Sequence, residues 1–190
     1  MSALKRPEAA KAKRGSQLRI PLGILLAAML LLWGLWGSAA NGQTRLNFNN
    51  ADLRGQDLSR QDWRGSSFVS ANLQGADLHG ANLTGVVFTK ANLAGANLSG
   101  ADLSNSLLDL ANLAGADLRG ANLTGAIAAR AVWQGAQIAG ADFSEAYVDR
   151  AAKRQLCEQA EGSHPVTGVT TRESLSCPGN PPQNPQPRQT

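Results

Sequence analysis

A five-residue period runs through more than half of this 190-residue chain and constrains its fold more than any other feature. From residue 46 to residue 150 the sequence divides without insertion into 21 pentapeptides, and the central position of all 21 is apolar. The position two residues earlier is Ala in 15 units, and the position between them is Asp or Asn in 14. An amphipathic helix needs apolar spacings of three and four, and a half-buried strand needs a spacing of two. A period of five therefore predicts a solenoid, in which each unit forms one side of a coil and then turns a corner.

A second period of 20 residues is superimposed on the first. Every fourth unit lacks a final Gly, whereas 12 of the other 15 units end in Gly. The units without it end in Asn50, Ser70, Lys90, Leu110, Arg130 and Arg150. We call the side that they form face A; its units are centred on Phe48, Phe68, Phe88, Leu108, Ala128 and Val148. Four units per coil, stacked at about 4.8 Å, predict a four-sided tower of about five coils and about 25 Å.

Tandem units such as residues 71–75 (ANLQG) and 76–80 (ADLHG) resemble those of the pentapeptide-repeat family. The resemblance covers 105 of the 190 residues. It implies an all-β solenoid, the right-handed quadrilateral β-helix, in which the central residue and the small residue two positions earlier point inward. The other three side chains of each unit point outward. Close packing supports the same assignment, because a narrow prism has room for little more than a Leu and an Ala on each side.

The first 45 residues carry the features of a targeting signal. Residues 1–19 form a basic segment with six cations and one Glu, residues 20–40 contain no charge, and residues 41–45 form a linker. A helix of 21 uncharged residues can cross a bilayer core of about 30 Å. The positive-inside rule leaves residues 1–19 in the cytoplasm and predicts export of everything after Asn41. Small residues at 38–40 also fit a cleavage site, so a retained transmembrane anchor and a cleaved signal segment both stay open.

The repeats carry no signature of a nucleic-acid-binding protein or an enzyme. Residues 46–150 hold seven Lys or Arg against ten Asp or Glu, so the basic pI of about 9.5 comes from the N-terminus. This balance predicts no nucleic-acid partner. The sequence contains no nucleophile elbow, phosphate-binding loop or zinc-binding pattern, so we expect no catalytic residue, no metal and no cofactor. His79 at an outward position and His164 in the tail are expected to be solvated.

Face A carries apolar residues where the other three sides carry mainly Asp and Asn. Its outward position before the centre holds Asn47, Ser67, Val87, Leu107, Ile127 and Tyr147 in order. Apolar area with cations at its rim is typical of a protein contact surface. The sequence therefore predicts an interaction face made of Val87, Lys90, Leu107, Leu110, Ile127, Arg130, Tyr147 and Arg150. Two occupants stay open, a partner protein and the chain's own C-terminal segment.

Residues 151–177 are expected to cap the last coil. They begin with AAKRQLCEQA, a candidate short helix that would cover an open backbone edge. Cys157 and Cys177 are the only cysteines, and two cysteines in an exported chain favour a disulfide. Residues 156–177 also resemble the C-terminal segment of exported cyanobacterial pentapeptide-repeat proteins, which implies a thylakoid lumen or a periplasm. The Pro-rich residues 178–190 are expected to be disordered.

These features predict a non-catalytic interaction or scaffold module on the non-cytoplasmic side of a membrane, with a protein partner that the sequence does not name. Membrane contact would come through residues 20–40 if they are not cleaved. Two alternatives are a DNA mimic that binds a topoisomerase, like the gyrase-protecting members of the family, and an assembly or stability factor for a membrane complex. The DNA mimic needs cytosolic access and a strongly acidic surface, and the sequence predicts neither.

Overall fold

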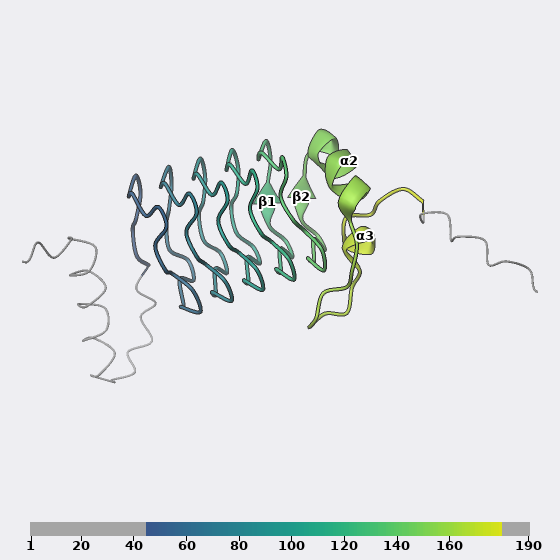
Figure 1. Cartoon of the computed structure of the whole chain (residues 1–190), viewed down its shortest axis with the longest axis horizontal. Coiled ribbons are helices and arrows are strands. Elements are labelled where there is room, and N and C mark those ends of the chain that lie inside the picture. Colours follow the sequence, from purple (N-terminus) through teal and green to yellow (C-terminus); the bar gives the residue numbers. More distant parts are fainter. Residues whose placement is uncertain (1–44, 180–190) are drawn as a thin grey trace, which may run out of the picture. The chain divides into compact units, whose positions relative to one another are not determined.

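The computed structural model describes residues 45–179, which form a four-sided coil followed by two short helices (Figure 1). The predictions for residues 1–19, 20–40 and most of the linker lie outside the described residues, as do the final residues 180–190. Within the part of the chain that the structure describes, no helix is long and apolar enough to span a bilayer.

Parallel backbone bridges between residues 20 positions apart join each coil to the next. Sixteen isolated bridges follow this rule, beginning with Asn47 and Ser67 and ending with Asn122 and Asp142. The strands β1 (Ile127–Ala128) and β2 (Tyr147–Val148) pair in parallel with the same separation. One coil therefore takes 20 residues, or four pentapeptides, and the units of one side stack in a column (Figure 1).

The four sides follow one another along the chain as faces A, B, C and D. Face B contains the units centred on Leu53 and every twentieth residue after it, face C those that start from Leu58, and face D those that start from Trp63. Up to Glu145, the last residue of each unit turns the corner with a left-handed φ between 54° and 70°. Glycine adopts this conformation without a steric penalty, which explains its frequency at the corners of faces B to D.

The core is a column of central side chains separated by small residues. From Trp63 to Phe143 every central residue is at most 3% exposed, and the Ala residues two positions earlier are buried beside them. On face A the rings of Phe48, Phe68 and Phe88 stack, with centroids 4.9 and 5.3 Å apart. The inward assignment of these two positions is therefore confirmed.

The outward Asp and Asn residues have a structural role at each turn. In all 14 units that carry one, its side-chain oxygen accepts a hydrogen bond from the backbone N–H two residues later. This is the usual turn-forming role of Asp and Asn. Asn92 and Asn112 also each donate to the Asn of the preceding coil, at 3.1 and 3.2 Å. The Asn and Asp columns therefore stabilise the turns and the stacking of the coils.

The C-terminal segment covers the edge of the last coil. Helix α2 (Arg150–Gln159) begins where the repeats end. The Nε2 atoms of Gln155 and Gln159 donate to the carbonyl oxygens of Trp133 and Ala136, at 3.3 and 2.9 Å. The carbonyl of Ala136 has no next coil to donate to it, unlike the equivalent carbonyl of Ala116, which accepts from the N–H of Gln137 at 2.9 Å. The carbonyl of Trp133 also accepts from the N–H of Ala136 at 3.0 Å. The helix therefore satisfies a backbone edge that would otherwise be open to pairing with another chain.

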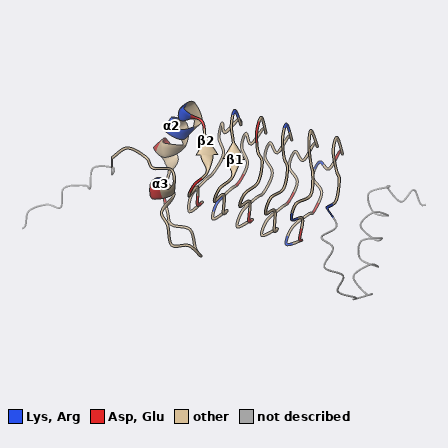
Figure 2. Cartoon of the chain, turned by 180° about the vertical axis from the view of Figure 1, so that it is seen from behind, with Lys and Arg blue, Asp and Glu red and all other residues tan. Residues whose placement is uncertain are grey.

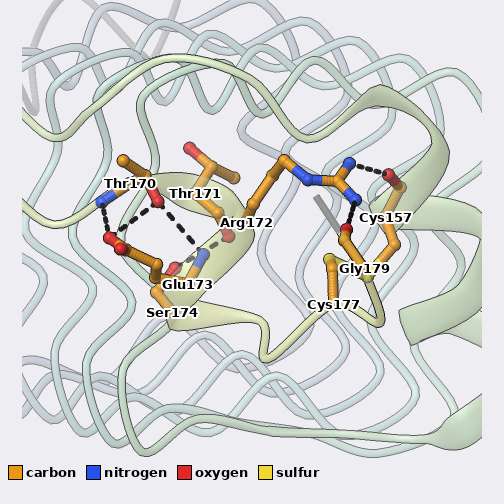
Figure 3. Close-up of a disulfide and its surroundings, with 8 residues drawn as sticks. All are labelled: Cys157, Thr170, Thr171, Arg172, Glu173, Ser174, Cys177 and Gly179. Carbon is orange, nitrogen blue, oxygen red and sulfur yellow. Dashed lines mark hydrogen bonds between the residues drawn. A yellow bond between two sulfur atoms is a disulfide. The ribbon is translucent and has the colours of Figure 1, made fainter. Parts of the chain in front are cut away.

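A disulfide holds the end of the cap to α2 (Figure 3). Cys157 in α2 is bonded to Cys177, which follows helix α3 (Thr171–Ser174), so the predicted disulfide is present. The guanidinium of Arg172 donates to the carbonyl oxygens of Cys157 and Gly179, at 3.0 and 2.9 Å. The covalent bond and these hydrogen bonds together close the cap.

Substitution by Ala at two neighbouring positions of the tower should change the free energy of unfolding by different amounts. Leu73 is fully buried in the core, whereas Gln74 is exposed. We expect Leu73→Ala to lower the free energy of unfolding by about 2–5 kcal/mol, because it removes apolar contacts and leaves a cavity. The control Gln74→Ala should change it by less than about 0.5 kcal/mol. Chemical denaturation followed by circular dichroism measures both values, and equal effects would contradict the inward assignment.

Removal of the disulfide should loosen the cap more than the tower. Cys157 and Cys177 are 20 residues apart, and closing a loop of that length contributes about 3 kcal/mol in the chain-entropy model. For the double variant Cys157→Ser with Cys177→Ser, we expect amide hydrogen exchange in α2 and α3 to rise on the order of a hundredfold. Exchange in the middle coils should stay nearly unchanged. Equal acceleration in both regions would show that cap and tower open as one unit.

Candidate interaction face

Val87, Leu107, Ile127 and Tyr147 occupy one outward position in successive coils of face A. Parallel bridges join Val87 to Leu107 and Leu107 to Ile127, and the pairing of β1 with β2 joins Ile127 to Tyr147. Neighbours in this column are therefore about 4.8 Å apart along the tower. Leu107 is 37% exposed, Ile127 43% and Tyr147 60%. Together with Leu110, which is 38% exposed at the adjoining corner, they form what we call the apolar stripe.

Basic side chains lie at the corner beside the stripe. Lys90 and Arg130 turn the corner in two of the coils, and Arg150, the final residue of the last unit of face A, is the first residue of α2. Arg130 is compensated, because its Nη2 atom lies 3.0 Å from a carboxylate oxygen of Asp109. Lys90 and Arg150 form no ion pair with any residue in the described range. The structure places all eight residues of the predicted interaction face on this side and its adjoining corner.

Along the stripe, face A lacks the turn hydrogen bond that Asp and Asn supply elsewhere. The N–H of Thr84 on face D donates to Asn82, but the equivalent N–H groups of Thr89 and Asp109 find no side-chain acceptor among residues 45–179. The reason is that Val87 and Leu107 stand where the other faces carry Asp or Asn. A hydrogen bond of this kind contributes about 0.5–1.5 kcal/mol. The stripe therefore makes its own turns less stable.

Face A also lacks glycine at its corners. Ser70, Lys90, Leu110 and Arg130 adopt left-handed φ values between 56° and 60°. This conformation costs a residue with a Cβ atom about 1–2 kcal/mol. Two departures from the stabilising repeat pattern thus coincide on the side that exposes apolar side chains. Strain retained in this way is concentrated at functional sites in proteins generally.

The cap lies against another part of the tower and leaves the stripe exposed. The carbonyl oxygen of Glu161 accepts a 2.8 Å hydrogen bond from the backbone N–H of Gly140, at the corner between faces C and D. The hydroxyl of Thr167 donates to the carboxylate of Asp142 on face D, at 2.7 Å. Residues 151–179 therefore do not cover face A, although the chain's own C-terminal segment was one of its two expected occupants.

His164 is buried, which corrects the expectation that it is solvated. Its exposed fraction is 5%, and its Nδ1 atom accepts hydrogen bonds from the backbone N–H groups of Val166 and Thr167, at 3.4 and 3.1 Å. Nothing in the spacing of a single His predicts this turn. His79 is half-buried, with its Nδ1 atom 2.8 Å from Asp77. No group of three or more His, Cys, Asp or Glu side chains in the described range could hold a metal ion.

Val132 extends the apolar surface around the corner onto face B. It is 47% exposed and continues the column of Asn92 and Asn112, two residues after Arg130. The sequence shows the loss of Asn at this position, but it does not show whether the cap covers the last coil there. Val132 therefore lies outside the interaction face that the sequence predicts.

Charge also separates face A from the other sides. Its units carry three cations and two carboxylates, whereas the units of faces B to D carry four cations and eight carboxylates. A hydrogen bond from Arg119 lowers the pKa of Asp117, and one from Arg64 lowers the pKa of Asp62, so these carboxylates are ionised at neutral pH. Face A is the one side of the described repeats with a net positive charge. The tower lacks the strongly acidic surface that a DNA mimic needs.

Comparison with known proteins identifies the repeat. Residues 47–85, 87–125 and 116–151 match the family model for pentapeptide repeats, in eight copies. A pentapeptide repeat protein from the Arabidopsis thaliana thylakoid lumen is 35% identical, with 77% of this chain and 99% of that chain covered and a TM-score of 0.66. Rfr23, a pentapeptide repeat protein from the cyanobacterium Cyanothece, is 26% identical, with 52% and 88% covered and a TM-score of 0.37. No curated protein sequence matches the chain.

The left-handed corner at Lys90 predicts a stabilising substitution. Lys90→Gly should raise the free energy of unfolding by about 1 kcal/mol, because it removes the steric penalty of a side chain at φ 60°. The reverse change Gly95→Lys is the control. A Cβ atom at Gly95 would meet no atom within 4 Å, so its expected loss of about 1 kcal/mol comes from the backbone alone. Chemical denaturation measures both changes, and a less stable Lys90→Gly variant would contradict strain at this corner.

Proposed function

Because this chain belongs to the pentapeptide-repeat family, whose members fold as right-handed quadrilateral β-helices, we propose that it is a non-catalytic module that binds a partner protein through face A. The tower of about five coils would act as a rigid support for the apolar stripe. Its partner would contact the stripe and the cations at the adjoining corner.

The observation that supports this proposal is the coincidence of three features on one side of the tower. Face A exposes apolar side chains at Leu107, Ile127 and Tyr147, lacks turn hydrogen bonds beside Val87 and Leu107, and has strained corners. The missing turn hydrogen bonds and the strained corners do not help the chain to fold. A contiguous exposed apolar patch is a feature of protein contact sites, and a protein partner would bury this one.

The described residues favour binding over catalysis. Core side chains fill the tower, and the two cysteines are joined in a disulfide rather than free to react. A cavity of about 210 Å³ lies under the cap, lined in part by Glu145, Lys153 and Ser174. This volume is below the roughly 300–1,000 Å³ of typical ligand pockets. A surface rather than a pocket is therefore the natural site of function.

Three observations support a location outside the cytoplasm. The Arabidopsis relative comes from the thylakoid lumen and is covered over 99% of its length. The Cys157–Cys177 disulfide fits an oxidising compartment. The uncharged residues 20–40 follow a basic segment, as in an export signal or an anchor. We therefore place the module in a thylakoid lumen or a periplasm, held to the membrane by residues 20–40 if they are retained.

Replacing apolar residues of face A with the Asn that is common at this position of the repeat should change partner binding without lowering the stability of the fold. Leu107→Asn with Ile127→Asn removes apolar surface and restores an acceptor for the N–H groups two residues later. We expect the free energy of unfolding to stay equal or to rise by about 1–2 kcal/mol, since each turn regains a hydrogen bond. Crosslinking in native membranes should lose the partner that the unmodified protein captures.

Gln137→Asn is the matched control, because it introduces the same Asn acceptor at an exposed position of face C without removing apolar surface. It should retain the crosslinked partner. If the double variant keeps that partner at full yield, face A does not bind it and the proposed function is wrong.

A further inference from the structure

We infer that the occupant of face A is an acidic amphipathic helix of a partner protein, with its apolar side on the stripe and its carboxylates toward Lys90 and Arg150. This inference rests on the proposed function and adds the charge and the secondary structure of the partner. It depends on the charges left without a partner on this side, on the spacing of the stripe, and on the composition of the chain's own termini.

The cations of face A are only partly compensated by the chain itself. Arg130 is paired with Asp109, and the carboxylate of Asp149 accepts hydrogen bonds from the first N–H groups of α2. Lys90 and Arg150 have no ion-pair partner among residues 45–179. Besides Arg150, helix α2 contains Lys153 and Arg154, and it begins two residues after β2, at the C-terminal end of the stripe (Figure 2). This end of the face therefore attracts negative charge on an otherwise acidic tower.

Spacing favours a helix over a strand as the occupant. Successive side chains of the stripe are about 4.8 Å apart along the tower. One turn of an α-helix rises about 5.4 Å, so a helix laid along the stripe presents one apolar position per coil with a mismatch of about 0.6 Å. Alternate residues of a strand are about 6.6–6.8 Å apart and fall out of register after one coil. From Val87 to Tyr147 the stripe crosses three coil steps, which corresponds to about three helical turns.

The termini of this chain do not have the composition of that occupant. Residues 1–44 contain six cations and one Glu, and residues 180–190 contain one Arg, four Pro and no Asp or Glu. Both segments are net positive and would be repelled by Lys90 and Arg150. A second copy of the tower would present the same cations. A different protein with an acidic helix is the occupant that these charges favour.

Peptide binding to the full-length chain tests this inference. Three synthetic 18-residue probes share four Leu residues: a helix-forming peptide with Glu at its other charged positions, the same peptide with Lys instead, and a Glu peptide interrupted by Pro so that it stays extended. Fluorescence anisotropy gives each Kd for the unmodified chain, for Leu107→Asn with Ile127→Asn, and for the control Gln137→Asn. All three proteins keep residues 20–40, so binding to that segment cancels in the comparison.

We expect the acidic helical peptide to bind the unmodified chain and the Gln137→Asn variant at least tenfold more tightly than the double variant. It should also bind at least tenfold more tightly than either other probe. The charge reversal Lys90→Glu should weaken its binding severalfold and strengthen that of the Lys peptide.

Two outcomes would overturn the inference and leave the proposed function standing. Equal binding of the Glu and Lys helices would show that charge does not select the partner, and equal binding of the extended Glu peptide would show that helix spacing does not. If no probe distinguishes the unmodified chain from the double variant, the acidic-helix occupant is wrong. The crosslinking experiment on face A then decides the proposed function separately.

Discussion

Backbone hydrogen bonds that bridge residues 20 positions apart hold every other feature of the tower in place. The N–H of Leu73 donates to Asn92 at 2.7 Å, and the N–H of Asn92 donates back to Ala71 at 2.9 Å. This register fixes which side chains point inward. The central residue of each unit and the small residue two positions earlier lie on the inner side of the backbone. It also stacks each outward position in a column. A substitution repeated every 20 residues therefore builds a continuous surface rather than scattered changes.

Because the register is fixed by the backbone and the core, the outward columns can vary with little effect on the fold. They contribute to the fold in two ways. Asp or Asn supplies the turn hydrogen bond, and the last residue of each unit adopts the left-handed corner conformation, which Gly adopts easily. Faces B to D keep both in most units, and face A keeps neither along its C-terminal half. Each exception costs on the order of 1 kcal/mol, so several in one column are not a by-product of stability.

The sequence was sufficient to predict the interior of the tower because burial imposes the period directly. Leu73 and Phe88 lie in the core as their positions in the repeat require, and the pairing of Cys157 with Cys177 follows from there being two cysteines in the chain. The path of the cap could not be predicted, because it depends on contacts without a period, such as Thr167 with Asp142. The burial of His164 follows from the same turn.

The location of the cap decides how the stripe can be interpreted. If residues 151–179 crossed face A, the apolar side chains would be part of the chain's own core, and their cost to the turns would be offset by burial within the monomer. The cap instead binds the corner between faces C and D through Gly140 and Asp142, so no such offset exists among the described residues. Leu107 and Ile127 are 37% and 43% exposed, so part of each apolar side chain stays in contact with water in the isolated domain. A partner that covered this repeated surface would bury apolar area that the isolated domain leaves in contact with water, and this is why we propose face A as the binding surface.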